Sequence, residues 1–149
     1  MSKTIYVAAD HGGYDLKNQI VNHLSDNYSV EDLGPDKLQL DDDYPDYVLK
    51  LVESMRSNDN SVGVLACRSA EGVSIAANRN DWIRAAVVTE IDQAIKAREH
   101  NDANVICLSG DLVAPERNIK LLEAFLVTEF SDEPRHKRRI EKIEKYFPL

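Results

Sequence analysis

Short apolar runs alternate with helical patterns about five times along this chain of 149 residues. The runs cover residues 4–9, 28–33, 62–66, 85–88 and 105–108, and most are rich in Val, Ile, Leu and Ala. A continuous apolar strand suits a parallel sheet that helices cover on both faces, because neither face of the strand then meets water. The alternation therefore predicts an α/β protein with a doubly wound parallel sheet.

The segments between these runs carry helix signals. Leu16, Ile20 and Leu24 recur every four residues, which places them on one helix face. Prolines at positions 45, 115 and 134 suit the first turns of three further helices. The polar stretch 35–44 contains three consecutive aspartates, and we interpret it as a solvated loop rather than a metal site. The sequence has no internal repeat or linker, so residues 1–149 are predicted to form a single domain.

Composition narrows the classes of partner. A formal net charge of −8 disfavours nucleic acid and anionic membranes. The sequence contains no apolar run of 18 residues, so no membrane span is predicted. Residues 1–9 lack the basic region and apolar core of a signal peptide, and the two cysteines lie at or within apolar runs rather than in a disulfide pattern. These features predict a protein of the reducing cytoplasm.

The ends of the predicted strands gather groups that can do chemistry. Five of the six glycines lie just beyond a predicted strand, at the edge where a doubly wound sheet binds ligands. Polar and reactive side chains accompany them. The sequence predicts that six of these converge at the same edge: Asp10, His11, Cys67, Ser69, His100 and Asn101.

Cys67 ends an apolar run and stands directly before a predicted helix, in the stretch VLACRSAEGVSIAANR. Two interpretations remain open: a small buried hydrophobic residue, or a thiolate whose pKa is lowered by the N–H groups of the helix terminus. Cys107 lies in the middle of a predicted strand and is interpreted as structural. The backbone from Arg68 to Val73 could form a nest of N–H donors for an anion. The nucleotide-binding patterns G-x-G-x-x-G and P-loop do not occur.

A basic cluster at residues 135–139 stands out in this acidic chain. One interpretation is a solvated helix or a salt bridge at the sheet edge. The other is a phosphate site, because Arg135 and Arg139 are four residues apart and share one helix face. The four histidines show no i, i+4 pair and no zinc-like spacing to cysteine, so no metal is predicted.

The chain contains the segments AADHGGYDLK, DYPDY, GVLACRSAEGVSIAANR, IRAAV, AREHNDANVICLSG and RHKRRIEKI. Together they resemble type B ribose-5-phosphate isomerase, whose family also includes the subunits of galactose-6-phosphate isomerase. The similarity extends over nearly the whole chain. The D-H-x-G and R-E-H-N-D-x-N-V patterns are specific in combination.

The resemblance implies a Rossmann-like three-layer α/β/α sandwich with a five-stranded parallel sheet and a C-terminal helix that packs on a partner subunit. It also implies an aldose–ketose isomerase that needs no cofactor and works through a cis-enediol. Active sites in this family lie at the interface of a homodimer, and dimers can pair into tetramers. The implied reaction interconverts ribose 5-phosphate and ribulose 5-phosphate.

Roles for individual residues also follow from the resemblance. Cys67 would move a proton between two carbons, Ser69 would position and polarise the carbonyl end, and His100 would assist opening of the furanose ring. These roles agree with the need for a base and a stabilised oxyanion beside a carbonyl. The implied binding residues are Asp10 and Asn101 for sugar hydroxyls, Tyr44 at the wall of the site, and His11, Arg135 and Arg139 for the phosphate, with the arginines reaching across from the neighbouring subunit.

One loop departs from the family pattern, which is C-G-[ST]-G-x-G. This chain has C-R-S-A-E-G, so the predicted site is lined by Arg68, Ala70, Glu71 and Gly72. A positive φ at residue 68 or 70 would strain the backbone. For Glu71 we favour an ion pair with Arg68. The alternatives are repulsion of an enediolate, or action as the base in place of Cys67.

These changes keep other functions open. The alternatives are a hexose 6-phosphate isomerase of galactose or allose type and a non-catalytic binder of sugar phosphates. The joint presence of Cys67, Ser69, His100 and Asn101 argues against the binder. Nucleotide binding rests on fold analogy alone, and the missing glycine-rich turn disfavours it.

Overall fold

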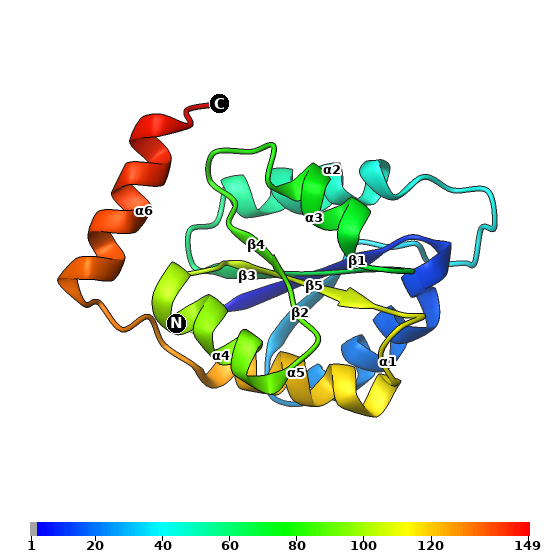
Figure 1. Ribbon diagram of the computed structural model, residues 1–149. Helices are drawn as coiled ribbons and strands as arrows, with labels where there is room; N and C mark the ends of the chain where they lie inside the picture. The colour runs from blue at the N-terminus through cyan, green and yellow to red at the C-terminus, as the bar shows by residue number, and fades with distance from the viewer. Residues whose placement is uncertain (1–2) are drawn as a thin grey trace.

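The computed structural model describes residues 3–149 and contains a sheet of five strands in the order β2-β1-β3-β5-β4 (Figure 1). The strands are β1 (Thr4–Ala9), β2 (Ser29–Asp32), β3 (Ser61–Cys67), β4 (Ala85–Val87) and β5 (Val105–Ser109). Every neighbouring pair is parallel, which confirms the fold class predicted from the apolar runs. Met1 and Ser2, part of the segment predicted to lack a signal peptide, lie outside the described residues.

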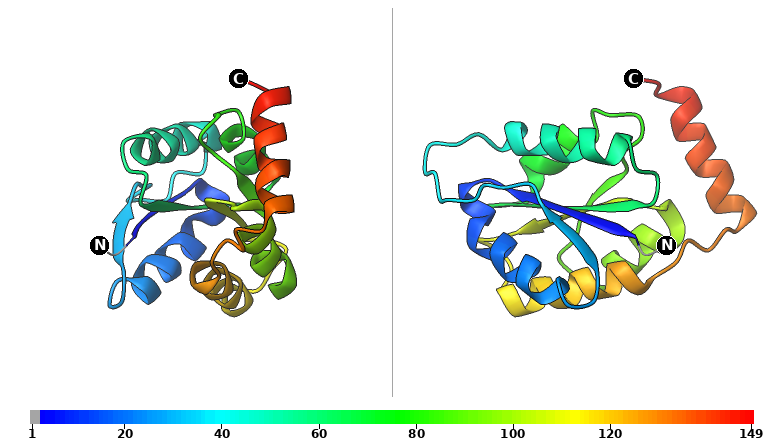
Figure 2. Two further views of the ribbon diagram at one scale, coloured as in Figure 1. Left: turned by 90° about the vertical axis from the view of Figure 1, so that its left-hand side faces the viewer. Right: turned by 180° about the vertical axis from the view of Figure 1, so that it is seen from behind.

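Helices cover both faces of the sheet. On one face lie α2 (Tyr44–Arg56) and α3 (Glu71–Ala77), and on the other lie α1 (Tyr14–Leu24), α4 (Ile91–Asn101) and α5 (Pro115–Val127) (Figure 1; Figure 2). A single 3-10 turn, η1 (His11–Gly13), joins β1 to α1. This is the three-layer sandwich that the resemblance implies. Within residues 3–149, no helix has the length and apolar character that crossing a membrane requires.

Side chains of the strands alternate between two apolar cores, one under each layer of helices. In β3, Val64 and Ala66 belong to the core shared with α1 and α5, whereas Leu65 and Cys67 belong to the core shared with α2 and α3. A slip of one residue would exchange the two faces, so this burial fixes the register of β3. It places Cys67 at the carboxyl end of the central strand, on the side of α2 and α3.

The last helix, α6 (Pro134–Tyr146), stands beside the sandwich rather than on a face of the sheet (Figure 2). It approaches α4, and its buried residue is His136. Ile143, Tyr146 and Phe147 are exposed at its C-terminal end. Packing of this helix on a partner subunit stays a prediction.

Gly13, the last residue of η1, lies close to the backbone of β3. A methyl group at this position would lie 2.4 Å from the carbonyl carbon and oxygen of Ala66, and backbone atoms cannot move away as a flexible side chain could. Gly13→Ala is therefore expected to lower the free energy of unfolding by about 1–3 kcal/mol, measured by urea denaturation. The control is Gln19→Ala, an exposed change on the following helix α1, expected within about 0.5 kcal/mol of the unsubstituted chain. An equal stability of Gly13→Ala would contradict the close approach.

Candidate active site

Asp10 and Cys67 lie at the carboxyl ends of the neighbouring strands β1 and β3. From β1 the chain continues to β2 on one side, and from β3 it continues to the strands on the other side. Such a switch point leaves a crevice in which doubly wound folds bind ligands. The backbone N–H of Asp10 donates to the carbonyl of Ala66 at 3.3 Å. The carboxylate of Asp10 is buried and accepts from the N–H groups of Gly12 at 2.8 Å and Gly13 at 3.2 Å, which fixes its position.

The sulfur of Cys67 accepts hydrogen bonds from the backbone N–H groups of Val73, Ala70 and Ser69. Burial nevertheless raises the pKa of Cys67 above its usual value, and the nearby charge of Asp10 adds to the increase. The N–H groups favour the thiolate, but they do not reverse the effect of burial. Of the two interpretations, a thiol whose pKa is lowered overall is therefore wrong: the N–H groups act in the expected direction, but loss of water outweighs them.

The loop that follows Cys67 lies at the same carboxyl end of the sheet. Ala70 has a φ of 71°, in the left-handed region, so the strain predicted for position 68 or 70 occurs at 70 and costs about 1–2 kcal/mol. Ser69 is exposed, and its Oγ accepts from the N–H of Glu71 at 3.4 Å. A methyl group on Gly72 would lie 2.6 Å from the ring of Tyr44, so that ring lies against the glycine. Tyr44, the first residue of α2, thus lies against the loop that follows Cys67.

Arg68 has a different partner from the one that the sequence suggests. Its Nη1 lies 3.3 Å from Oδ2 of Asp111, in the turn after β5. The favoured ion pair between Arg68 and Glu71 is therefore wrong. Glu71 is an exposed residue at the start of α3, where a carboxylate is favourable beside the N-terminal N–H groups.

Asp42 contacts the site although the sequence suggests that the whole aspartate run is solvated. Its Oδ1 accepts from the backbone N–H of His11 at 3.0 Å and lies 2.7 Å from Nδ1 of the same residue. The side chain of Asp42 is 5% exposed, so the interpretation of a solvated loop is wrong for this residue. Burial, followed by a hydrogen bond to Asp42, raises the pKa of Tyr47. The two contacts of Asp42 with His11 fix both the backbone and the ring of that histidine.

Asp10, His11 and Asp42 also form the group of described residues whose ligand atoms could hold a metal ion, because these atoms all lie within 4.8 Å of one another. Each of the three side chains already has a hydrogen-bond partner, although Oδ2 of Asp42 is buried without one. Asp42 Oδ1 is bonded to His11, and Asp10 accepts two backbone N–H groups. The arrangement thus serves as a hydrogen-bonded support for His11, and the absence of a metal requirement stays a prediction.

These groups form what we call the carboxyl-edge cluster, because they lie at the carboxyl ends of the strands. Its members are Asp10, His11, Asp42, Tyr44, Cys67, Arg68, Ser69, Ala70, Glu71 and Gly72. Of the members, only Asp42 was missed by the sequence analysis. Nothing in a run of three identical residues indicates which one turns toward the site.

His100 and Asn101 lie at the opposite edge of the sheet. They end α4, and the chain then enters β5 at Val105. Because α4 returns the chain from the end of β4 to the start of β5, its last turn must lie where parallel strands begin. The N–H of Gly63, near the start of β3, donates to the carbonyl of Asn104 at 2.9 Å. The prediction that all six residues converge at one edge of a single chain is therefore wrong.

The arginines of α6 accompany His100 at this edge. The ring of His100 contacts that of the buried His136 at a centroid distance of 4.4 Å. Arg135 and Arg139 flank this histidine on α6 and are exposed. We call His100, Asn101, Arg135 and Arg139 the amino-edge cluster. In Figure 1, β1 points to the right-hand side whereas α6 stands at the left, so the carboxyl end of β1 and helix α6 lie on opposite sides of the chain.

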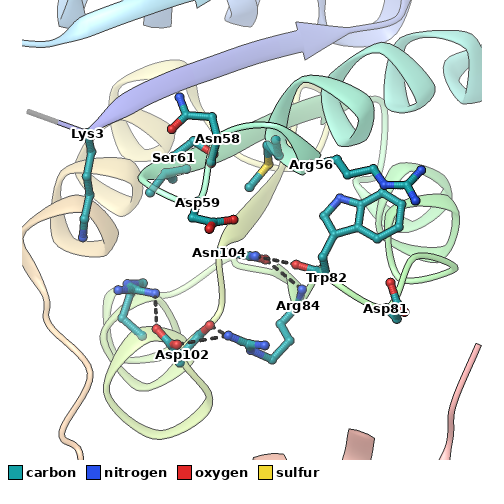
Figure 3. A pocket seen from close by; sticks show the side chains of 13 residues that line it. Lys3, Arg56, Asn58, Asp59, Ser61, Asp81, Trp82, Arg84, Asp102 and Asn104 are labelled. Carbon is teal, nitrogen blue, oxygen red and sulfur yellow. Dashed lines mark hydrogen bonds and ion pairs between the residues drawn. The ribbon is translucent and has the colours of Figure 1, made fainter.

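A cavity of about 530 Å³ lies at the amino edge, and Figure 3 shows its polar lining. The residues that line it within 3–149 include none of the predicted site residues. Asp102, directly after α4, accepts at Oδ2 from Arg84 at 3.0 Å and at Oδ1 from Arg98 at 2.9 Å. These two ion pairs hold the end of α4, and hence the positions of His100 and Asn101.

Comparison with known proteins identifies the family of this chain. The model of the family described as Ribose/Galactose Isomerase matches residues 5–143. The chain belongs to this isomerase family. The match includes both clusters, from Asp10 in the first to Arg139 in the second.

Individual members of the ribose/galactose isomerase family resemble this chain over almost its full length. A protein of Mycoplasma pneumoniae named probable ribose-5-phosphate isomerase B is 45% identical, over 98% of this chain and 96% of that protein. The crystal structure of ribose-5-phosphate isomerase B from Mycoplasma genitalium with bound ribulose-5-phosphate has a TM-score of 0.91 and 40% identity, over 98% and 97% of the two chains. The structure of the isomerase from Thermotoga maritima has a TM-score of 0.91 and 41% identity, over 96% and 98%.

Proposed function

We propose that residues 1–149 form one catalytic domain that interconverts ribose 5-phosphate and ribulose 5-phosphate in the cytoplasm, as a homodimer with shared active sites. The observation that carries this proposal is the position of Cys67 at the switch point of the sheet, beside the fixed carboxylate of Asp10 and the hydroxyl of Ser69. Relatives at 45% and 40% identity are named ribose-5-phosphate isomerase B, which favours a pentose over a hexose phosphate. Both cysteines are free thiols, in keeping with a reducing compartment.

The reaction is a proton transfer between two neighbouring carbons. In the open-chain aldose, the Cys67 thiolate removes the proton from C2, the electrons of that bond form a C1–C2 double bond, and the carbonyl electrons move to O1. The hydroxyl proton of O2 moves to O1, so that the negative charge passes to O2. The electrons on O2 then form the new C2 carbonyl, and the electrons of the C1–C2 double bond take a proton from the Cys67 thiol onto C1, which restores the thiolate. Ser69 donates a hydrogen bond to the developing oxyanion, and Asp10 accepts one from a sugar hydroxyl. Because no electrons leave the substrate, the chemistry balances without an oxidant, a reductant or a cofactor.

The amino-edge cluster of one chain lies too far from its own Cys67, so a second copy of the chain supplies these groups. In this proposal the amino-edge cluster of one subunit faces the carboxyl-edge cluster of its partner, so that His100 assists ring opening and Asn101 binds a hydroxyl. A two-fold axis makes two identical composite sites. The exposed Ile143, Phe147 and Leu149 support such an interface, because a partner would bury them.

The phosphate lies between the clusters in this arrangement. His11 contacts it from one subunit, and Arg135 and Arg139 contact it from the other. Guanidinium groups suit phosphate because their planar donors form paired charge-assisted hydrogen bonds. Binding energy from this remote group is then available to orient C1 and C2 against Cys67.

Turnover with a series of sugar phosphates tests the proposal. The unsubstituted enzyme is expected to convert ribose 5-phosphate with a kcat/KM about 100-fold above that for galactose 6-phosphate or allose 6-phosphate, because a site complementary to a pentose transition state binds one with an additional carbon less well. In D₂O, NMR should show deuterium at C1 of the ribulose 5-phosphate formed, as proton return from a solvent-exchanging base requires. Binding of ribose 5-phosphate without turnover would instead show a non-catalytic binder, and preference for a six-carbon substrate would reassign the reaction.

A further inference from the structure

Arg68 is positioned beside the residue that is expected to contact the phosphate. A methyl group added to Gly12 would lie 2.3 Å from Cγ of Arg68 and 2.9 Å from its backbone nitrogen, so the stem of the arginine crosses directly over Gly12. Gly12 follows His11 in the chain. The side chain of Arg68 is 62% exposed, which leaves its guanidinium open to a ligand that enters the crevice.

The backbone of Arg68 is held firmly, whereas its guanidinium is held weakly. The carbonyl of Arg68 accepts from the N–H of Asp111 at 3.0 Å and from Oγ of Ser109 at 2.5 Å. The ion pair between the side chains of Arg68 and Asp111 has one contact at 3.3 Å, and both partners are substantially exposed. Water screens such a pair, so a stronger anion can replace the carboxylate.

The negative charges near Arg68 explain why an anionic ligand would need its guanidinium in place of Asp111. Asp10 accepts from the backbone beside His11, Asp42 contacts His11 itself, and Asp111 contacts Arg68, so three carboxylates surround these two side chains. Within the carboxyl-edge cluster the guanidinium group comes from Arg68, because Arg135 and Arg139 lie at the other edge. Its planar donors can bind two phosphate oxygens at once, which a single contact to Asp111 does not use.

We propose that Arg68 binds the terminal phosphate of the sugar phosphate from the same subunit as Cys67, and that Asp111 is a competing anion that sets the affinity. This inference rests on the proposed function. In the free enzyme Asp111 holds the guanidinium at the rim of the crevice. When the substrate enters, the phosphate takes the place of the carboxylate, and Arg68 and His11 contact it from one side.

Three variants test the exchange, with steady-state kinetics on ribose 5-phosphate and competitive inhibition by inorganic phosphate. Arg68→Gln is expected to raise KM and the phosphate inhibition constant about tenfold, with a smaller change in kcat, as the loss of one charge-assisted contact predicts. Asp111→Asn is expected to lower both constants about threefold, because the competing anion is gone. The control is Arg117→Gln, which removes another exposed arginine–carboxylate pair, that with Glu90, and is expected to leave both constants unchanged.

The outcomes separate this inference from the proposed function. Unchanged constants in Arg68→Gln would overturn the phosphate contact and leave the pair with Asp111 as a tie between two loops. Asp111→Asn raising KM as Arg68→Gln does would also overturn it, because the intact ion pair would then be what matters. Should the unsubstituted chain fail to turn over ribose 5-phosphate, the proposed function fails. Phosphate binding followed by ³¹P NMR in the same variants then still decides the role of Arg68.

Discussion

Replacing Cys67 with alanine is expected to lower kcat for ribose 5-phosphate by about 10³-fold, the usual range for loss of a positioned base. KM should change little, because the phosphate and the sugar hydroxyls are bound by other residues. Removal of one sulfur atom at the surface of the core leaves a small defect, so the variant should fold. Direct binding of ribose 5-phosphate, measured by calorimetry, separates loss of chemistry from loss of the substrate site.

The pH dependence of the unsubstituted enzyme provides a second measurement of the same role. Burial, with the charge of Asp10, raises the pKa of Cys67, so the thiol is mostly protonated at neutral pH. The thiolate fraction, and with it kcat/KM, should increase as the pH rises toward that pKa. The rate of alkylation by iodoacetamide should follow the same curve and fall when ribose 5-phosphate is present.

Glu71→Gln is the matched control, because Glu71 is the other group in the loop that could act as a base. It is exposed at the start of α3, whereas Cys67 lies at the switch point. The control should retain most of kcat and the full alkaline increase. A Cys67→Ala variant that keeps its activity, together with a Glu71→Gln variant that loses it, would transfer the base role to the carboxylate.

The fold and most of the carboxyl-edge cluster could be predicted because they depend on local patterns. The strands β1, β3 and β5 are buried on both faces and are therefore continuously apolar, so runs in the sequence mark them, whereas the edge strand β2 (SVED) is mostly exposed. Residues at the carboxyl ends of two neighbouring parallel strands lie close together, so the proximity of Asp10 and Cys67 could be predicted. Lys17 shows the limit of such patterns: its side chain is fully buried, with Nζ 2.7 Å from Asp32, next to the apolar stripe of α1. A lysine next to the apolar face of a helix does not show in the sequence that a strand provides an aspartate as its partner.

The remaining errors arose where several opposing effects or a long chain path decide the result. The pKa of Cys67 depends on burial, which opposes the N–H groups that the helix start suggested. Asp42 is drawn inward by His11, a residue 31 positions away. The position of His100 depends on the direction in which α4 crosses the sheet. Its place in the sequence after a predicted helix does not show at which end of the strands it lies.

The separation of the clusters leads to the last prediction, which concerns two inactive variants in one solution. Cys67→Ala and His100→Asn are each expected to be nearly inactive. In a mixed dimer, one composite site carries both substitutions, and the other combines the intact Cys67 of one subunit with the intact His100 of its partner. Random exchange of subunits in an equal mixture makes half of the dimers mixed, so about one quarter of the unsubstituted activity should return.

A mixture of Cys67→Ala with Ser69→Ala is the control, because both substitutions lie in the carboxyl-edge cluster. Every site of that mixed dimer keeps one defect, so no activity should return. Two affinity tags, purified in series after refolding from urea, establish that mixed dimers have formed in each case. If mixed dimers of Cys67→Ala and His100→Asn stay inactive, the sites are not shared. Each chain would then have to bring its own α4 terminus across the whole sheet to Cys67, which the fixed register of β3 and β5 does not allow. The proposed roles of His100, Asn101 and the arginines would fall together.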